Sequence, residues 1–405
     1  MTTMQDIPDF NQEIDRSGTN ALAVEGYQGY LFRKDPVQMR HAPEDLIHMW
    51  VADMALATPP AVIDAVKRRL EHPLFGYTGQ FDGDYADAFC AWTQERYGWS
   101  FKRSALRIAT GVIPALYSLV ELLCKPGEKV LTLTPAYGYF AHAARANDIE
   151  LATCPLAEGP DGFRVDPERF RQAAADPKTT LFFLCHPHNP TGRLWSPEEL
   201  AEMAEICFEH DVFIVSDEIH CDLLRSGLIH TPLARLFPES KRIVTCMAPS
   251  KTFNMAGFQI ANVIIPDADL RKRWKRKNLP FYNPLSLAAA RGAYADGGPW
   301  LEALRAHLDQ NFATLQRRLT EALPRARFRI PEATYLAWVD LGAYFDDSTN
   351  LTRFFAERAG LLLEGGDMFV ADGGLNVRLN IACPQQTLEA AIQRLVDAIH
   401  RAQKP

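Results

Sequence analysis

The chain has 405 residues, of which 47% are hydrophobic, and this is enough for one large domain with a buried core and a second, smaller domain. Its formal net charge of −7 argues against a surface built mainly to bind nucleic acid. The eight cysteines are scattered without any CxxC pair, which favours free thiols in a reducing compartment over a disulfide framework.

The N-terminal stretch "MTTMQDIPDFNQEIDRSG" is polar and acidic, without the basic and apolar regions of a signal peptide. No apolar run reaches the length that crosses a membrane. The one strongly basic run, "RKRWKRKNLP" at residues 271–280, is best explained as a solvated helix face. We therefore expect a cytoplasmic protein that binds a small molecule and neither membrane nor nucleic acid.

From about residue 60 to residue 300 the sequence alternates between helical and extended patterns. "PPAVIDAVKRRLEH" begins with prolines suited to a helix N-terminus. In "SPEELAEMAEICFEH", Ser196 and Glu199 form a predicted capping box. Runs that predict short buried strands are "KVLTLTP", "TTLFFLCHP", "VFIVSDE", "RIVTCMAPSK" and "ANVIIP". Such strands, separated by helices, predict a mostly parallel sheet covered by helices on both faces.

The last third of the chain has a different pattern. A helical tract from Leu285 to about Leu323 is interrupted at "DGGPW". It is followed by the strands "ATYLAWVDL" and "NVRLNIAC" and by the amphipathic helix "TLEAAIQRLVDAIHRA". We predict an α/β fold with a large domain at residues 59–300. A smaller α+β domain is expected from the N-terminal segment, residues 1–58, together with residues 301–405.

The segment "VFIVSDEIHCDL", residues 212–223, ends a predicted strand on Asp-Glu-Ile-His. In helicases such a strand end holds Mg²⁺ and the attacking water. In enzymes that use pyridoxal 5′-phosphate (PLP), a strand ends in an Asp that pairs with the nitrogen of the cofactor ring. A helicase also needs a G-x-x-x-x-G-K-[ST] loop to bind phosphates, and this chain contains no Gly-Lys dipeptide. The helicase interpretation is therefore rejected.

Residues at the other strand ends favour the cofactor interpretation, because ligands of open parallel sheets bind outside the carboxyl ends of the strands. Lys251 could form a Schiff base, and Asp217 could keep a pyridine nitrogen protonated. Gly111 precedes a helix whose first N–H groups could bind a phosphate. Tyr137 could stack on a ring, and the Asn189 amide could donate to a phenolate oxygen. Each residue alone has an ordinary structural explanation, so the prediction depends on their combination.

This combination resembles the fold-type-I PLP enzymes of the class I/II aminotransferase family and, within it, cystathionine β-lyases of the MalY/PatB type. The resemblance extends from about "MWVADM" to the C-terminus. The motifs that carry it are "FGYTG", "PAYGYF", "CHPHNPTGRLWS", "VSDEIHCDL", "APSKTFNMAG", "GGPWLEAL", "ATYLAWVDL" and "VRLNIACP". It implies that residues 59–300 form a PLP-binding domain and that the N-terminal segment also contributes to a dimer contact.

The resemblance implies a role for each matching residue. Lys251 would form the Schiff base, Asp217 would pair with the ring nitrogen, and His220 and Asn189 would lie near the phenolic oxygen. Tyr137 would stack on the ring, while Ser250 and the backbone of Gly111, Val112 and Ile113 would hold the phosphate. Tyr77 would reach the phosphate of a neighbouring subunit and take part in catalysis, which implies a homodimer. The amino-acid substrate would contact Arg378, Asn189 and Ala52, with Arg378 binding the α-carboxylate.

Two reactions compete in such a site once the Cα proton is removed, for which Lys251 is the expected base. Elimination of a sulfur leaving group from Cβ gives a thiol, pyruvate and ammonia, whereas reprotonation at the cofactor gives transamination. Many aminotransferases of the family have an arginine eight residues after the lysine, whereas this chain has Gln259 there. The β-lyase branch also lacks this arginine. The resemblance therefore favours a cystathionine or cysteine-S-conjugate β-lyase, with an aminotransferase as the alternative.

Several positions depart from the lyase pattern and are expected at the substrate entrance: Tyr27, Ala55-Leu56, His186 and the loop "GGDMFVADGGLN" before Arg378. They leave open a specialised PLP enzyme of secondary metabolism. A regulator that binds a transcription factor also stays open, although no docking motif supports it. No metal is expected, because His186, His188, His220 and Cys221 lack the spacing of common zinc sites.

Overall fold

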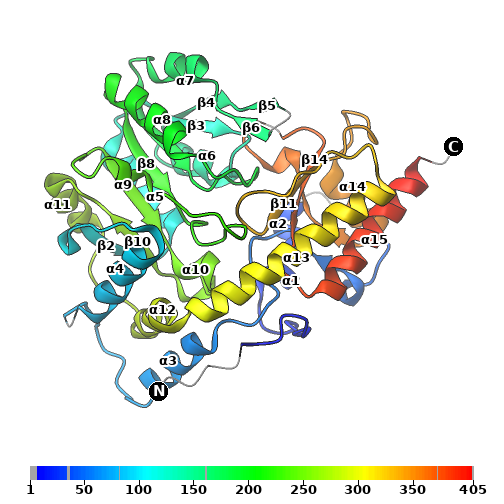
Figure 1. Cartoon of the computed structure of the whole chain (residues 1–405), viewed down its shortest axis with the longest axis horizontal. Helices are drawn as coiled ribbons and strands as arrows, with labels where there is room; N and C mark the ends of the chain where they lie inside the picture. Colours follow the sequence, from blue (N-terminus) through cyan, green and yellow to red (C-terminus); the bar gives the residue numbers. More distant parts are fainter. Residues whose placement is uncertain (1–6, 34–36, 82, 160–161, 372, 404–405) are drawn as a thin grey trace.

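A computed structural model describes residues 7–33, 37–81, 83–159, 162–371 and 373–403. Over these residues the central sheet has seven strands in the order β2-β10-β9-β8-β7-β3-β4 (Figure 1). The strands are β2 (Leu106–Ala109), β3 (Lys129–Thr134), β4 (Glu150–Pro155), β7 (Thr179–Cys185), β8 (Phe213–Asp217), β9 (Ile243–Met247) and β10 (Ala261–Ile264). β10 pairs antiparallel with β2 and β9, and the other described pairs of this sheet are parallel, so the predicted α/β fold with a mostly parallel sheet is confirmed.

Helices cover both faces of this sheet, as consecutive residues of β7 show. Phe183 packs into a cluster with α5 (Val112–Leu123), α6 (Gly138–Arg145) and α11 (Ala268–Lys277). Its neighbour Phe182 packs into another cluster with α7 (Pro167–Ala174) and α8 (Pro197–Glu209). Successive side chains of a strand point to opposite faces. A strand between two helical layers therefore needs the continuous apolar run that the sequence has there.

Two predicted helix boundaries are also confirmed. Ser196 caps α8: its hydroxyl accepts from the N–H of Glu199 at 3.2 Å, and the Glu199 carboxylate accepts from the N–H of Ser196 at 2.8 Å. The helical tract is divided at "DGGPW", where α12 (Pro284–Asp296) ends and α13 (Gly298–Ala322) begins. Helix α12 packs against α3 (Pro60–Leu70) and α4 (Asp84–Tyr97).

The N- and C-terminal parts of the chain pack together (Figure 1). β1 (Ile47–His48) pairs in parallel with β12 (Leu361–Leu362). A separate antiparallel sheet has the order β11 (Leu336–Asp340), β14 (Asn376–Asn380) and β13 (Glu364–Gly365). The helices of this region are α1 (Leu22–Glu25), α2 (Tyr27–Leu31), α14 (Leu351–Ala359) and α15 (Gln385–Ala402). The domain boundaries at residues 58 and 300 stay a prediction, and α13 runs through the second one.

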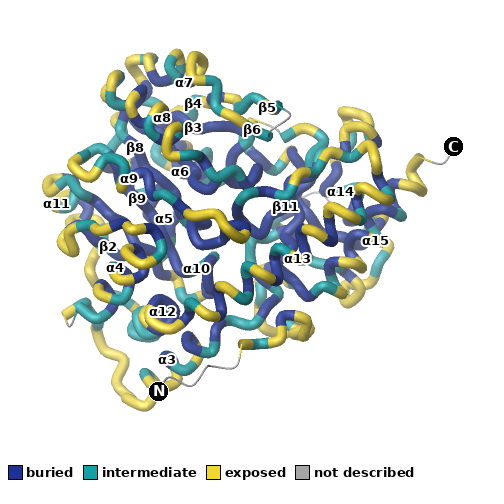
Figure 2. The backbone as a smooth tube through the Cα atoms, viewed as in Figure 1, coloured by how far each residue is buried: buried dark blue, intermediate teal, exposed yellow. Residues whose placement is uncertain are grey.

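Burial follows this architecture (Figure 2). The inner strands β3, β7, β8, β9 and β10 are mostly buried, the edge strand β4 is partly exposed, and the segment after α3, residues 71–77, is exposed throughout. Among the described residues, no helix combines the length and the apolar character needed to cross a membrane.

Candidate active site

A cavity of about 190 Å³ lies at the carboxyl ends of the central strands, beside the N-terminus of α5. Its lining contains every predicted site residue except Tyr77 and Arg378: Ala52, Gly111, Val112, Ile113, Tyr137, Asn189, Asp217, His220, Ser250 and Lys251. Cys185, Gln259 and Ile260 also line it, among others. The structure therefore brings together residues that are far apart in the sequence, while their individual roles stay predictions.

Lys251 lies in α10 (Pro249–Thr252), directly after β9. Its Nζ donates a hydrogen bond to the carbonyl oxygen of Ala52 at 2.5 Å. Burial lowers the pKa of the Lys251 amine to about 8, although the charge of Asp53 acts in the opposite direction. With this pKa, roughly a tenth of the amine is neutral at pH 7, far more than for an ordinary lysine, and the neutral form is the one that acts as a nucleophile or a base.

Asp217 is the last residue of β8 and is 6% exposed. One carboxylate oxygen accepts a hydrogen bond from the backbone N–H of Ile219 at 3.2 Å. Burial raises the pKa of the Asp217 carboxyl to about 7, because the ionised form is poorly solvated. A positively charged ligand group beside this carboxylate would stabilise its ionised form, as a protonated pyridine nitrogen does.

The N-terminus of α5 provides backbone N–H groups at another part of the cavity wall. Gly111 is the N-cap, and Val112 and Ile113 are the first two helical residues. Ser250 and Gln259 line the same cavity. Free N–H groups and the helix dipole make this end suited to an anion such as a phosphate. Gln259, unlike an arginine, adds no charge there.

Aromatic and amide groups complete the lining. Burial lowers the pKa of His220 to about 3, so its imidazole is neutral, and its Nδ1 has no hydrogen-bond partner in the part of the chain described here. The ring of Tyr137 lies 5.3 Å from that of Tyr139. Asn189 Oδ1 accepts a hydrogen bond from Arg378 Nη1 at 3.0 Å. The lining can therefore hold a flat ring that has hydrogen-bonding groups on its edge.

Arg378 lies on β14 behind Asn189 rather than on the cavity wall itself, and it is 2% exposed. Its Nη2 donates to the carbonyl oxygen of Trp50 at 3.1 Å and forms an ion pair with Glu364. Glu364 was not predicted from the sequence, and neither was Tyr30, whose ring packs 4.9 Å from that of Trp50. No motif marks either residue; the only signal was that Glu364 directly precedes a loop that departs from the lyase pattern.

Two positions expected at the substrate entrance lie elsewhere, so that expectation was wrong for them. His186 is fully buried, stacks on His230 with a ring separation of 4.5 Å, and its Nε2 lies 3.1 Å from the carbonyl oxygen of Thr231. Tyr27 is buried against Phe32. Both side chains are packed by residues distant in the sequence, which a local motif does not reveal.

Tyr77 lies outside the cavity and is 92% exposed. Its ring packs against that of Phe281 at 5.1 Å. Within a single chain this tyrosine contacts none of the cavity residues named above, which leaves its predicted role across a subunit interface untested.

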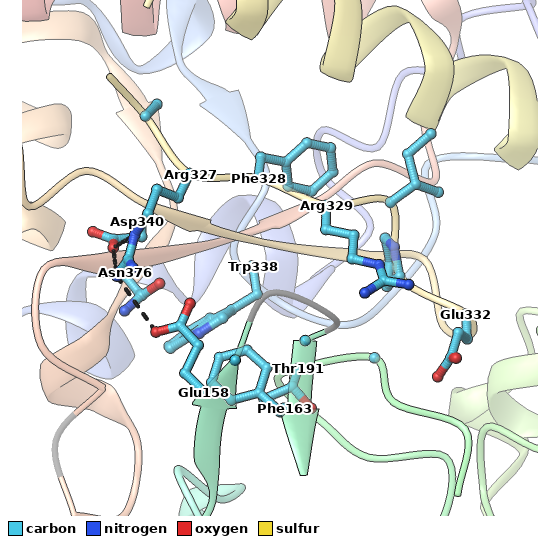
Figure 3. Close-up of a pocket in the computed structure, with 16 residues that line it drawn as sticks. Glu158, Phe163, Thr191, Arg327, Phe328, Arg329, Glu332, Trp338, Asp340 and Asn376 are labelled. Carbon is cyan, nitrogen blue, oxygen red and sulfur yellow. Dashed lines mark hydrogen bonds and ion pairs between the residues drawn. The ribbon is translucent and has the colours of Figure 1, made fainter. Parts of the chain in front are cut away.

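A larger cavity of about 600 Å³ lies on the other side of the "HNPTG" loop (Figure 3). The hairpin of β5 (Ala157–Gly159) and β6 (Gly162–Arg164), residues 326–332 and β11 surround it. Arg327 pairs there with Asp340 and, at 3.4 Å, with Glu158. It contains none of the lysine, aspartate and helix-terminus groups of the smaller cavity. No set of three or more His, Cys, Asp or Glu side chains that could bind a metal is present among the described residues.

Comparison with known proteins places this arrangement in a family. The model of the family "Aminotransferase class I and II" matches residues 44–395. The chain belongs to this family. It is 38% identical to cystathionine beta-lyase PatB of Bacillus subtilis over 88% of this chain and 93% of PatB. It is 30% identical to protein MalY of Escherichia coli over 96% of this chain and 98% of MalY.

A solved structure shares the fold of this chain. The PLP-bound C-S lyase from Staphylococcus hominis superposes with a TM-score of 0.92 at 40% identity, over 97% of this chain and 98% of that chain. The predicted resemblance to the MalY/PatB type is therefore confirmed.

A buried hydrogen-bond network supports the strand end that carries Asp217. The Glu218 carboxyl group lies 2.7 Å from His230 Nε2 and accepts from the Ser216 hydroxyl at 2.7 Å, and the Glu218 and His230 side chains are fully buried. Burial lowers the pKa of His230 to about 3, so its imidazole is neutral and this contact is a hydrogen bond. Glu218→Ala should lower the free energy of unfolding by about 1–3 kcal/mol, because buried hydrogen-bonding groups of His230 and Ser216 lose their partner. Urea denaturation measures this, with the exposed Glu202→Ala as the control. Equal stability of the two variants would contradict the structural role of the network.

Proposed function

We propose that this chain is a PLP enzyme that catalyses β-elimination on sulfur-containing amino acids such as cystathionine, releasing a thiol, pyruvate and ammonia. The observation that carries the proposal is one cavity in which Lys251, Asp217 and the N-terminus of α5 meet. The similarity to a protein named cystathionine beta-lyase over most of both chains supports the same reaction.

The groups in the cavity fit PLP chemically. The buried Asp217 carboxylate needs a cation, and a protonated ring nitrogen is one. The Nδ1 of His220, which has no partner among the described residues, and the Asn189 side chain suit the phenolic oxygen of the ring. The first N–H groups of α5 and the Ser250 hydroxyl suit the phosphate. When bound, PLP withdraws electrons from the substrate Cα, which makes the Cα–H bond acidic.

The residues of the chain then have distinct tasks. Lys251, with its lowered amine pKa, accepts the proton from the substrate Cα. Asp217 keeps the ring nitrogen protonated, and Arg378 binds the α-carboxylate through a planar guanidinium. Loss of the sulfur group from Cβ completes elimination. Gln259 adds no positive charge at the phosphate end, as the resemblance to the β-lyase branch leads us to expect.

Pyruvate release tests this function directly. The purified protein with PLP should show the visible absorbance of a lysine-bound cofactor and release pyruvate and homocysteine from L-cystathionine. Lys251→Ala should lose this band and reduce kcat by about 10²–10⁴-fold, because the proton acceptor is removed. The exposed Lys178→Ala is the matched control and should keep both. Conversion to a pyridoxamine-type spectrum without pyruvate would instead favour the aminotransferase, and absence of the band would exclude PLP.

We also infer that the chain forms a homodimer. The segment after α3 and the segment before α12 present large exposed apolar side chains: Leu74, Phe75, Tyr77, Phe81, Leu279 and Phe281. The two segments are joined by a bridge between Thr78 and Tyr282 and by the Tyr77–Phe281 ring contact. A contiguous exposed apolar patch of this kind is typical of an interaction surface. The predicted contact of Tyr77 with the cofactor phosphate of the partner subunit agrees with such a dimer.

A charge in this patch should weaken the dimer. Phe281→Asp is expected to shift the sedimentation mass at micromolar concentration from twice 45.5 kDa toward 45.5 kDa, because a charge would have to be buried at the interface. The exposed Ile229→Asp, which lies outside the patch, should leave the mass unchanged. A monomeric wild-type protein would disprove the dimer.

The cysteines support the expected cytoplasmic location. All eight thiols are free in the structure, and six of them are buried. Free cysteines are usual in a reducing compartment.

A further inference from the structure

The guanidinium of Arg378 is already paired with a carboxylate inside the protein. Arg378 and Glu364 stand directly opposite each other on β14 and β13. Arg378 Nη2 and Glu364 Oε2 form an ion pair, and the two side chains are 2% and 5% exposed. The remaining hydrogen bonds of Arg378 found in the described residues run to Asn189 Oδ1 and to the carbonyl oxygen of Trp50. Arg378 and Glu364 therefore form a buried unit without net charge.

An amino-acid substrate would bring a second carboxylate to this arginine. One guanidinium would then face two anions where little water is present, and Glu364 would lose part of its counter-charge. A buried charge without a full partner is costly. The α-amino group of the substrate cannot compensate, because its nitrogen is the atom that reacts with the cofactor.

The surroundings of Glu364 suit a positively charged group. Burial, and after it the charge of Glu364, raises the pKa of the Tyr30 hydroxyl. Burial is the main cause of the raised pKa of Tyr137 and of the lowered pKa of Lys251, and the charge of Glu364 adds to the first shift and opposes the second. Glu364 is connected to the cavity through Arg378, which donates to Asn189 in its lining. The ring of Tyr30 packs 4.9 Å from that of Trp50, whose carbonyl oxygen accepts a hydrogen bond from Arg378. A carboxylate beside aromatic rings is a favourable environment for a cation.

We propose that Glu364 determines substrate specificity by selecting cysteine conjugates that carry a positive charge on the side chain beyond the sulfur. The α-carboxylate then pairs with Arg378, and the side-chain cation pairs with Glu364. Two pairs of opposite charges thus replace the single pair of Arg378 and Glu364. A neutral side chain leaves Glu364 short of a partner, and an anionic one adds repulsion. This inference rests on the proposed function, since it concerns the substrate of the same site.

Three substrates of similar length test it: S-(2-aminoethyl)-L-cysteine, S-propyl-L-cysteine and S-(2-carboxyethyl)-L-cysteine, with pyruvate release as the readout. The wild-type holoenzyme should prefer the aminoethyl over the propyl compound by about ten-fold or more in kcat/KM, and the carboxyethyl compound should be poorest. Glu364→Gln, which keeps the size of the side chain, should reduce the aminoethyl preference by about ten-fold. Glu357→Gln on α14, whose carboxylate pairs with Arg353 instead, should keep the wild-type preference.

A binding measurement separates failure of this inference from failure of the elimination reaction. L-lysine and L-norleucine have no leaving group on Cβ, so their dissociation constants, read from changes in the cofactor spectrum, do not depend on elimination. Tighter binding of L-lysine that is lost in Glu364→Gln supports the inference even if no sulfur compound yields pyruvate. Equal wild-type affinity for the two amino acids, or equal kcat/KM for the aminoethyl and propyl compounds, overturns it. The inference is also overturned if all substrates bind with equal affinity and each binding event takes up one proton. Glu364 would then be neutralised by protonation rather than by the side chain of the substrate.

Discussion

The parallel pairing of β7, β8 and β9 is the constraint on which the site depends. The register aligns Cys185 with Asp217 and Asp217 with Cys246, so the three strands end at the same level of the sheet. Asn189, His220 and Lys251 each follow one of these ends within a few residues. Because parallel strands deliver all their carboxyl ends to one edge, a short loop after each strand is enough to bring the residues together.

The same architecture controls the charges in the cavity. Helices on both faces bury the sheet, and burial shifts the pKa of Asp217 upward to about 7 and that of Lys251 downward to about 8. Both shifts favour the neutral form of the group. A ligand that brings a positive nitrogen and a negative phosphate restores the charge balance at two separate places: one beside Asp217, the other at the N-terminus of α5. The cavity is thus complementary to a bipolar ligand such as PLP.

The sequence was informative where the physical signal is local. Apolar runs of strand length, the Ser196 capping box and the break at "DGGPW" each depend on a few neighbouring residues, and the structure has all of them. The cavity lining was likewise predictable, because its residues directly follow strands. Glu364 and Tyr30 could not be found this way: Glu364 meets Arg378 only through the β13–β14 register, and Tyr30 meets Trp50 through packing of the N-terminal segment. His186 was placed wrongly for the same reason, because its partner His230 is distant in the sequence.

The residues with proposed roles in chemistry and in selectivity come from different parts of the chain. Asp217 ends β8 of the central sheet and Lys251 follows β9, whereas Arg378, Glu364 and Tyr30 belong to the terminal segments. Among the contacts that join the two parts are that of Asn189 with Arg378 and those of the Ala52 carbonyl, which accepts from both Lys251 and the Tyr335 hydroxyl. With the role proposed for Glu364, a substitution in the terminal segments would change which side chain is accepted while Asp217 and Lys251 keep their positions at the strand ends. This division explains how the cavity lining can keep the family pattern while the loop before Arg378 departs from it.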